Sequence, residues 1–199
     1  MLCGAGVLLI SVVGGLLGTP SATTSRERPA LWATFEVLNR GAFGGHGILH
    51  LEDLVGESKR RDIPGLPQPR VVVFFSALPS ECGAHQTGLC RDVETLRVKL
   101  GSEVLVVALI MTRPDEVSRT RGELAGAGYG LVAALDPQGV GARLLHMDRP
   151  GVAVVFDGAG RSVTLPPAND FGDPTQRRRW LRALRERVRE ALRTDEDGD

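Results

Sequence analysis

Hydrophobic residues form two long unbroken runs in the chain, and each run predicts a strand buried on both faces. Residues 71–75 (VVVFF) and 103–111 (EVLVVALIM) are almost entirely β-branched, aliphatic or aromatic. Shorter apolar runs predict further strands at 32–38, 47–51, 131–135, 151–157 and 162–165. A Gly-Ala-Gly turn at 158–160 joins the last two into a β-hairpin.

Apolar residues recur with the period of an α-helix between the strands. Leu89, Val93, Leu96 and Leu100 are spaced by four, three and four residues, with charged residues between them. The same reasoning predicts helices at 115–127 and 138–145, and a closing helix with an apolar face at Trp180, Leu181, Leu184, Val188 and Leu192. This order predicts an α/β fold in which the first strands are parallel and central and the hairpin is antiparallel beside them.

Length and composition narrow the function classes. The 199 residues are enough for one domain with a proper core. We place this domain at residues 31–193, with a linker at 23–30 before it and an acidic tail at 194–199 after it. The 24 basic and 24 acidic residues balance, so no nucleic-acid partner is predicted. The three cysteines and four histidines match no zinc-site spacing, and neither a metal nor a cofactor is predicted.

The N-terminus resembles a leader for export. Residues 7–17 are mostly apolar, and small residues follow them up to position 22. No Lys or Arg precedes this run, and it is shorter than the roughly 20 residues of a comfortable membrane span. We therefore interpret residues 1–22 as a signal peptide or, alternatively, an uncleaved anchor. Either one predicts an extracytoplasmic protein that touches the membrane only through this segment, if it is retained.

Cys82 is the first candidate for chemistry, because it lies between the strand at 71–75 and the helix that follows. A helix start favours a thiolate, and His85 could stabilise that thiolate further or move a proton. Repulsion from the neighbouring Glu81 carboxylate would raise the pKa of the Cys82 thiol and so disfavour the thiolate. Cys90 lies eight residues on, about 12 Å of rise on a continuous helix, and a disulfide tolerates a Cα separation of only about 7 Å. Cys90 is therefore predicted to be buried beside its apolar neighbours.

Four segments resemble the thioredoxin superfamily, most closely its extracytoplasmic redoxin and TlpA/ResA-like branch. They are the strand at 71–77, the strand at 104–111 with the Pro-Asp-Glu-Val that follows it, the Leu-Asp-Pro at 135–137 with Gly-Ala at 141–142, and residues 149–161. The resemblance spans about residues 33–192. It implies a three-layer sandwich with a central mixed sheet and a late β-hairpin. It also implies a cis-proline at Pro150, with Pro150 and Arg149 as substrate-binding residues.

The chain departs from the family at the active-site motif. Reductases of this family carry Cys-x-x-Cys at the helix start. One alignment places that motif on residues 79–82, with Pro79 at the nucleophilic position, and the other places it on residues 82–85, with His85 at the second position. The Thr-x-x-Cys of typical peroxiredoxins is also absent. A bond between Cys82 and Cys90 would require the helix to unwind, as in some peroxiredoxins with both cysteines on one helix.

Two functions remain open. The first is an exported redox protein that acts through Cys82 on protein thiols, protein disulfides or a small peroxide, with Cys90 or an external thiol resolving the intermediate. The second is an inactive domain of the same fold that holds a partner beside Pro150. Copper binding by Cys82, His85 and His146, as in Sco-like relatives, is disfavoured because the Cys-x-x-x-Cys of those relatives is missing.

Overall fold

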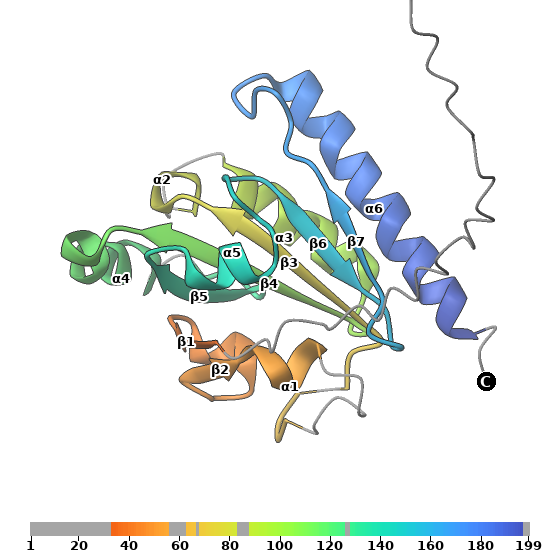
Figure 1. Cartoon of the computed structure of the whole chain (residues 1–199), viewed down its shortest axis with the longest axis horizontal. Helices are drawn as coiled ribbons and strands as arrows, with labels where there is room; N and C mark the ends of the chain where they lie inside the picture. Colours follow the sequence, from red (N-terminus) through yellow and green to blue (C-terminus); the bar gives the residue numbers. More distant parts are fainter. Residues whose placement is uncertain (1–32, 56–62, 67, 83–87, 126–127, 197–199) are drawn as a thin grey trace, which may run out of the picture.

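A computed structural model describes residues 33–55, 63–66, 68–82, 88–125 and 128–196 of the chain (Figure 1). The predicted leader and linker therefore lie outside the described residues. A seven-stranded sheet forms the centre, in the order β2-β1-β5-β4-β3-β6-β7. Its strands are β1 (Thr34–Val37), β2 (Ile48–His50), β3 (Val71–Ala77), β4 (Val104–Thr112), β5 (Val132–Pro137), β6 (Ala153–Phe156) and β7 (Ser162–Leu165).

The two long apolar runs form the centre of this sheet, as predicted. Every residue of β3 is buried. β3 pairs in parallel with β4, and β4 in parallel with β5, whereas β6 lies antiparallel on the other side of β3 and pairs with β7 in the predicted hairpin. The continuous apolar sequence of β3 and β4 follows from this position, because both faces of each strand are covered.

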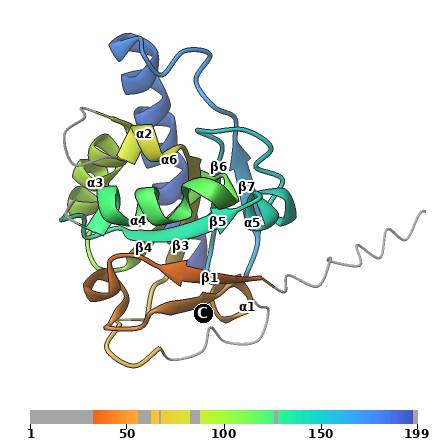
Figure 2. The same ribbon diagram turned by 90° about the vertical axis from the view of Figure 1, so that its left-hand side faces the viewer.

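Successive residues of β3 enter two different hydrophobic clusters. Val73 and Phe75 pack with residues of α3 (Leu89–Leu100) and α6 (Pro174–Glu196). Val72 and Phe74 pack on the opposite face, with residues of the N-terminal hairpin and of α5 (Val140–Leu144). Figure 2 shows β1 and α1 at the lower end of the view and the start of α6 at its upper end. The predicted three-layer α/β arrangement is confirmed.

Two short elements near the N-terminus were not predicted. The 3₁₀ helix η1 (Arg40–Phe43) follows β1, and α1 (Leu51–Val55) continues directly from β2. Five residues of α1 are too few to show a helical period, and this helix forms because Leu51, Leu54 and Val55 are buried against the sheet.

The remaining helical elements are η2 (Pro114–Glu116) and α4 (Val117–Ala125), together with the short α2 (Pro79–Cys82), which is considered below. The last helix, α6, reaches Glu196, within the segment predicted as a tail. Among the described residues, no helix combines the length and the apolar character needed to cross a membrane.

Candidate functional site

The parallel strands end together at one edge of the sheet. Ala77, the last residue of β3, pairs with Ile110 of β4, and Thr112, the last residue of β4, pairs with Pro137, the last residue of β5. In open α/β sheets, ligands bind in the crevice outside the carboxyl ends of the strands. The candidate site is built at this edge, where α2 begins two residues after β3 (Figure 1).

Cys82 and Cys90 form a disulfide that joins two helices. Cys82 is the last residue of α2, and Cys90 is the second residue of α3. Their Cα atoms lie 5.0 Å apart, within the range for a disulfide. The distance expected on one continuous helix does not apply, because the helix predicted to start near Cys82 is two helices. Cys90 is buried beside Leu89 and Val93, as predicted.

The disulfide lies inside the hydrophobic cluster between the sheet and α3. The exposed fraction is 1% for Cys82 and 0% for Cys90. Phe75 and Leu89 belong to the same cluster. Both cysteines are therefore shielded from an external thiol, and exchange requires the surrounding side chains to move.

α2 is a single helical turn, and Cys82 lies at its end. The four-residue helix starts at Pro79 and ends at Cys82, so the unpaired N–H groups of its first turn do not lie at Cys82. This start favours the alignment that places Pro79 at the nucleophilic position of the family motif. Cys90, by contrast, lies in the first turn of the twelve-residue α3, where the helix dipole stabilises a negative charge.

Glu81 holds the start of α2. Its Oε2 accepts a hydrogen bond of 2.8 Å from the Leu78 backbone N–H, which is one half of a capping box. Burial raises the pKa of the Glu81 carboxyl, and the bond from Leu78 offsets this only in part. The next helix approaches at the same point, since a β-carbon on Gly88 would overlap the Glu81 backbone carbonyl.

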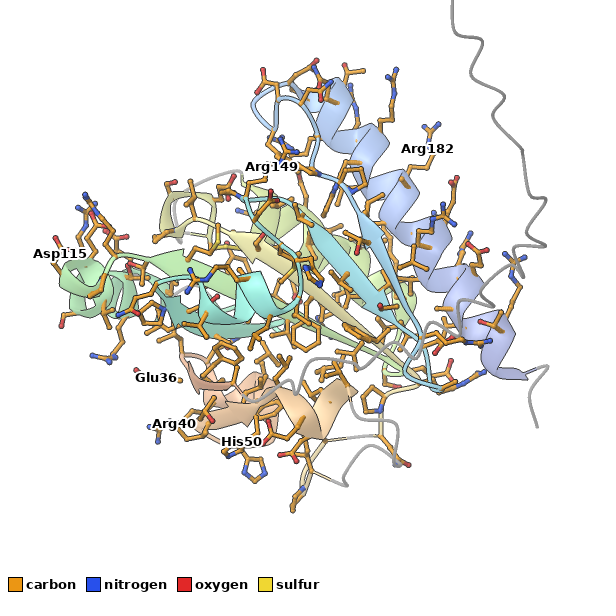
Figure 3. All side chains as sticks on the ribbon, in the orientation of Figure 1. Glu36, Arg40, His50, Asp115, Arg149 and Arg182 are labelled. Atoms are coloured by element: carbon orange, nitrogen blue, oxygen red, sulfur yellow. A yellow bond between two sulfur atoms is a disulfide. The ribbon has the colours of Figure 1, made fainter. Side chains whose placement is uncertain are left out.

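Pro150 lies in a turn that is fastened to the end of β3. The hydroxyl of buried Ser76 donates to the Arg149 carbonyl at 2.7 Å, and the Gly151 N–H donates to the Ser76 carbonyl at 2.7 Å. The Pro150 turn (residues 149–152) therefore lies at the same edge of the sheet as α2. The Arg149 side chain is exposed there, at the end of the molecule opposite His50 (Figure 3).

The prediction of a cis-proline at Pro150 is wrong. None of the described peptide bonds is cis. The turn has a weak bond of 3.5 Å from the Val152 N–H to the Arg149 carbonyl, and Gly151 has a φ of +80°. Proline followed by glycine with positive φ is the pattern of a type II turn, which takes proline in the trans form.

A cavity of about 1280 Å³ opens beside α2 at the same edge. Sequence reasoning did not find it. Its lining includes Pro79 and Ser80 of α2, Met111 of β4, Gly122 of α4, Ala142 of α5, and Met147. Cys82, on the same short helix as Pro79, points into the core instead. The signal that could have indicated the cavity is Met111, one residue before the end of β4.

Of the two histidines considered together with Cys82, the structure describes only His146. His85 lies outside the described residues, and His146 is exposed, with a φ of 55°. Within the described ranges, no group of three or more His, Cys, Asp or Glu side chains is arranged to hold a metal ion.

Solved structures with a similar fold exist, at low sequence identity. Three are dsbF from Mycobacterium tuberculosis (15% identity, 76% of this chain and 96% of that chain, TM-score 0.47), a secreted disulfide oxidoreductase of the same organism homologous to E. coli DsbE (11%, 77% and 96%, 0.46), and a putative thioredoxin from Neisseria meningitidis (15%, 82% and 90%, 0.46). No protein-family model matches the chain, and no curated protein matches its sequence. The fold is assigned from the strand order and pairing of this chain itself.

Proposed function

Because the chain has a thioredoxin-like fold with a cysteine pair at the carboxyl end of its central strand, we propose that it is a thiol–disulfide oxidoreductase acting through Cys82 and Cys90. The observation that carries the proposal is the disulfide that joins α2 to α3. It links the two cysteines that stand beside β3, the Pro150 turn and the cavity. A partner protein's thiols or disulfide are the proposed substrate.

The exchange runs in two steps. A substrate thiolate attacks the Cys82 sulfur, a mixed disulfide forms, and Cys90 leaves as a thiolate. A second substrate thiolate then attacks the mixed disulfide at the substrate's sulfur, which releases an oxidised substrate and leaves Cys82 as a thiolate that takes up a proton. The chain gains two electrons in the cycle, and the reverse sequence reduces a substrate disulfide. The reduction potential of the pair against its surroundings sets the direction.

The helix geometry supports Cys82 as the attacked sulfur. Cys90 stands in the first turn of α3, where the N–H groups that lack intrahelical partners stabilise an anion. A leaving thiol with a lower pKa leaves faster. Attack at Cys82 therefore expels the better leaving group.

The proposed location is extracytoplasmic, with residues 1–22 as signal peptide or anchor. Disulfides form and persist in oxidising compartments and are rare where thiols are kept reduced. The Cys82–Cys90 bond is therefore consistent with export. Edman sequencing of the protein from its native host would show whether the mature chain starts after residue 22.

A second candidate function is a binding module in which the disulfide is structural. The burial of both cysteines, at 1% and 0% exposure, favours it. In that case the bond fixes α2 against α3, and the cavity beside α2 performs the function without exchange.

A trapping experiment separates the two candidates. In a Cys3→Ser background, reduced Cys90→Ser protein is mixed with insulin, and the product is analysed on a non-reducing gel and by mass spectrometry. Exchange predicts a stable mixed disulfide at Cys82, and much less adduct in the matched Cys82→Ser variant. Insulin reduction by dithiothreitol should be accelerated by the Cys3→Ser protein and not by the Cys82→Ser variant. Equal rates, together with no adduct, would leave only the binding module.

A further inference from the structure

The floor of the cavity beside α2 is apolar and adaptable. The chain has three methionines, and the two beyond Met1 both line this cavity: Met111 is partly exposed, and Met147 is buried beneath the surface of the floor. Leu78, Pro79 and Ala142 extend the apolar lining. Methionine side chains are flexible and polarisable, so surfaces rich in them accept apolar groups of different shapes. The floor can therefore bind apolar side chains of different shapes and does not select one of them.

The charged residues around the cavity compensate one another. Arg113 pairs with Glu116 at 2.8 Å, and Arg119 pairs with Glu123 at 2.8 Å. The remaining charged lining residues are one of each sign, Arg143 and Asp148. A ligand with a strong net charge finds no excess of opposite charge here. An uncharged ligand is favoured.

The volume points to a chain segment. Pockets for small molecules typically measure about 300–1,000 Å³, and this cavity holds about 1280 Å³. It is open to one edge of the sheet, between helices from both faces. An extended stretch of several residues fills such a space, with apolar side chains on the floor and its backbone beside the polar rim.

We infer that this cavity binds an extended, uncharged and mainly apolar segment of the protein whose cysteines exchange with Cys82–Cys90. The identity of that protein as the exchange partner rests on the proposed function, whereas binding of the segment does not. Pro79 and Ser80 form one wall, and the same four-residue helix carries Cys82. A bound segment therefore contacts the helix that carries one of the two exchanging cysteines.

Gly122 offers a direct way to fill the cavity. It lies in α4 and lines the cavity, and a β-carbon placed on it meets no other atom within 4 Å. Gly122→Trp therefore adds bulk at the cavity without a backbone clash, and Gly122→Ala is the matched control for the helix. Gly41, in η1, is exposed and equally open, so Gly41→Trp controls for an added surface indole far from the site.

The probe is insulin B chain with both cysteines alkylated and a fluorescein label, so that it can bind but cannot exchange. Fluorescence anisotropy with the oxidised full chain should give saturable binding to the wild type, Gly122→Ala and Gly41→Trp. The Kd should rise at least tenfold in Gly122→Trp, and a polyglutamate peptide of equal length should not bind. Thermal unfolding of each variant checks the fold, and Ser80→Trp, on the opposite wall, replaces Gly122→Trp if that variant is unfolded.

Absence of saturable binding to the wild type, or equal Kd values for wild type and the cavity-filled variant, would overturn the inference. Tight binding of the polyglutamate peptide would overturn it as well. Because the alkylated probe cannot exchange, these outcomes are independent of the trapping experiment. Binding without a mixed disulfide would remove the redox proposal and leave the peptide site.

Discussion

Gly88 packs directly against the backbone carbonyl of Glu81, with no room between them for a β-carbon. This contact brings the start of α3 against α2, beside the Cys82–Cys90 bond. The φ of Gly88 is −123°, so other residues can adopt its backbone conformation. Glycine is therefore required at position 88 only because there is no space for a side chain.

Gly88→Ala should therefore push the two helices apart. Overpacking of this kind costs about 1–3 kcal/mol, and the disulfide should be reduced faster by dithiothreitol than in the wild type. Urea unfolding and the rate of thiol release would measure both effects. Gly41→Ala, at an open position, is the control. Unchanged stability and reduction rate in Gly88→Ala would show that the contact is not a constraint in solution.

Reduction of the disulfide should lower the stability of the fold. The bond closes a short loop, with a sequence separation of eight residues, and loop-closure entropy predicts a loss of about 2–3 kcal/mol. Unfolding by urea with and without a phosphine reductant measures this. The Cys82→Ser/Cys90→Ser double variant should show no response to the reductant. An equal loss of stability in that variant would show that the reductant does not act through this disulfide.

Glu81→Gln should stabilise the protein at neutral pH. Burial raises the pKa of this carboxyl above its ordinary 4.5, so the folded state disfavours the charged form. Its stability contribution is complete below the unfolded pKa and is lost as the pH rises through the raised folded value. Glutamine keeps an oxygen for the Leu78 N–H. The gain in Tm should appear at pH 7–8 and vanish below about pH 4, and a gain that does not change with pH would contradict the assignment.

Asp136→Ala should destabilise the segment that leads to the cavity and the Pro150 turn. The buried Asp136 carboxylate accepts hydrogen bonds from the N–H groups of Gly141 and Ala142, at 3.1 and 2.9 Å. Removing it leaves both donors without their partner, at a cost of about 2 kcal/mol. Asp136→Asn keeps one acceptor and should lose less. Urea unfolding would test this order, and a loss below about 0.5 kcal/mol for alanine would contradict it.

The local pattern of apolar and polar residues was sufficient to predict most of the secondary structure. β3 and β4 were predicted because their residues are apolar on both faces, and α3 was predicted from residues 89–100 and spans Leu89–Leu100. Parallel pairing of β3, β4 and β5 followed from the crossover helices between them. Each of these features depends on residues close together in the sequence.

The site depended on contacts between distant residues. Nothing in residues 79–90 alone states that α2 ends at Cys82 and that Cys90 comes within 5.0 Å of it, Cα to Cα. The trans turn at Pro150 is held by Ser76, more than seventy residues away. The cavity exists only because α2, α4 and α5 meet at one sheet edge. The sequence by itself determined the elements, their order and the cysteine beside β3, because periodicity and burial are local. The tertiary structure alone decided the disulfide, the turn and the cavity, because packing across the sheet brings their residues together.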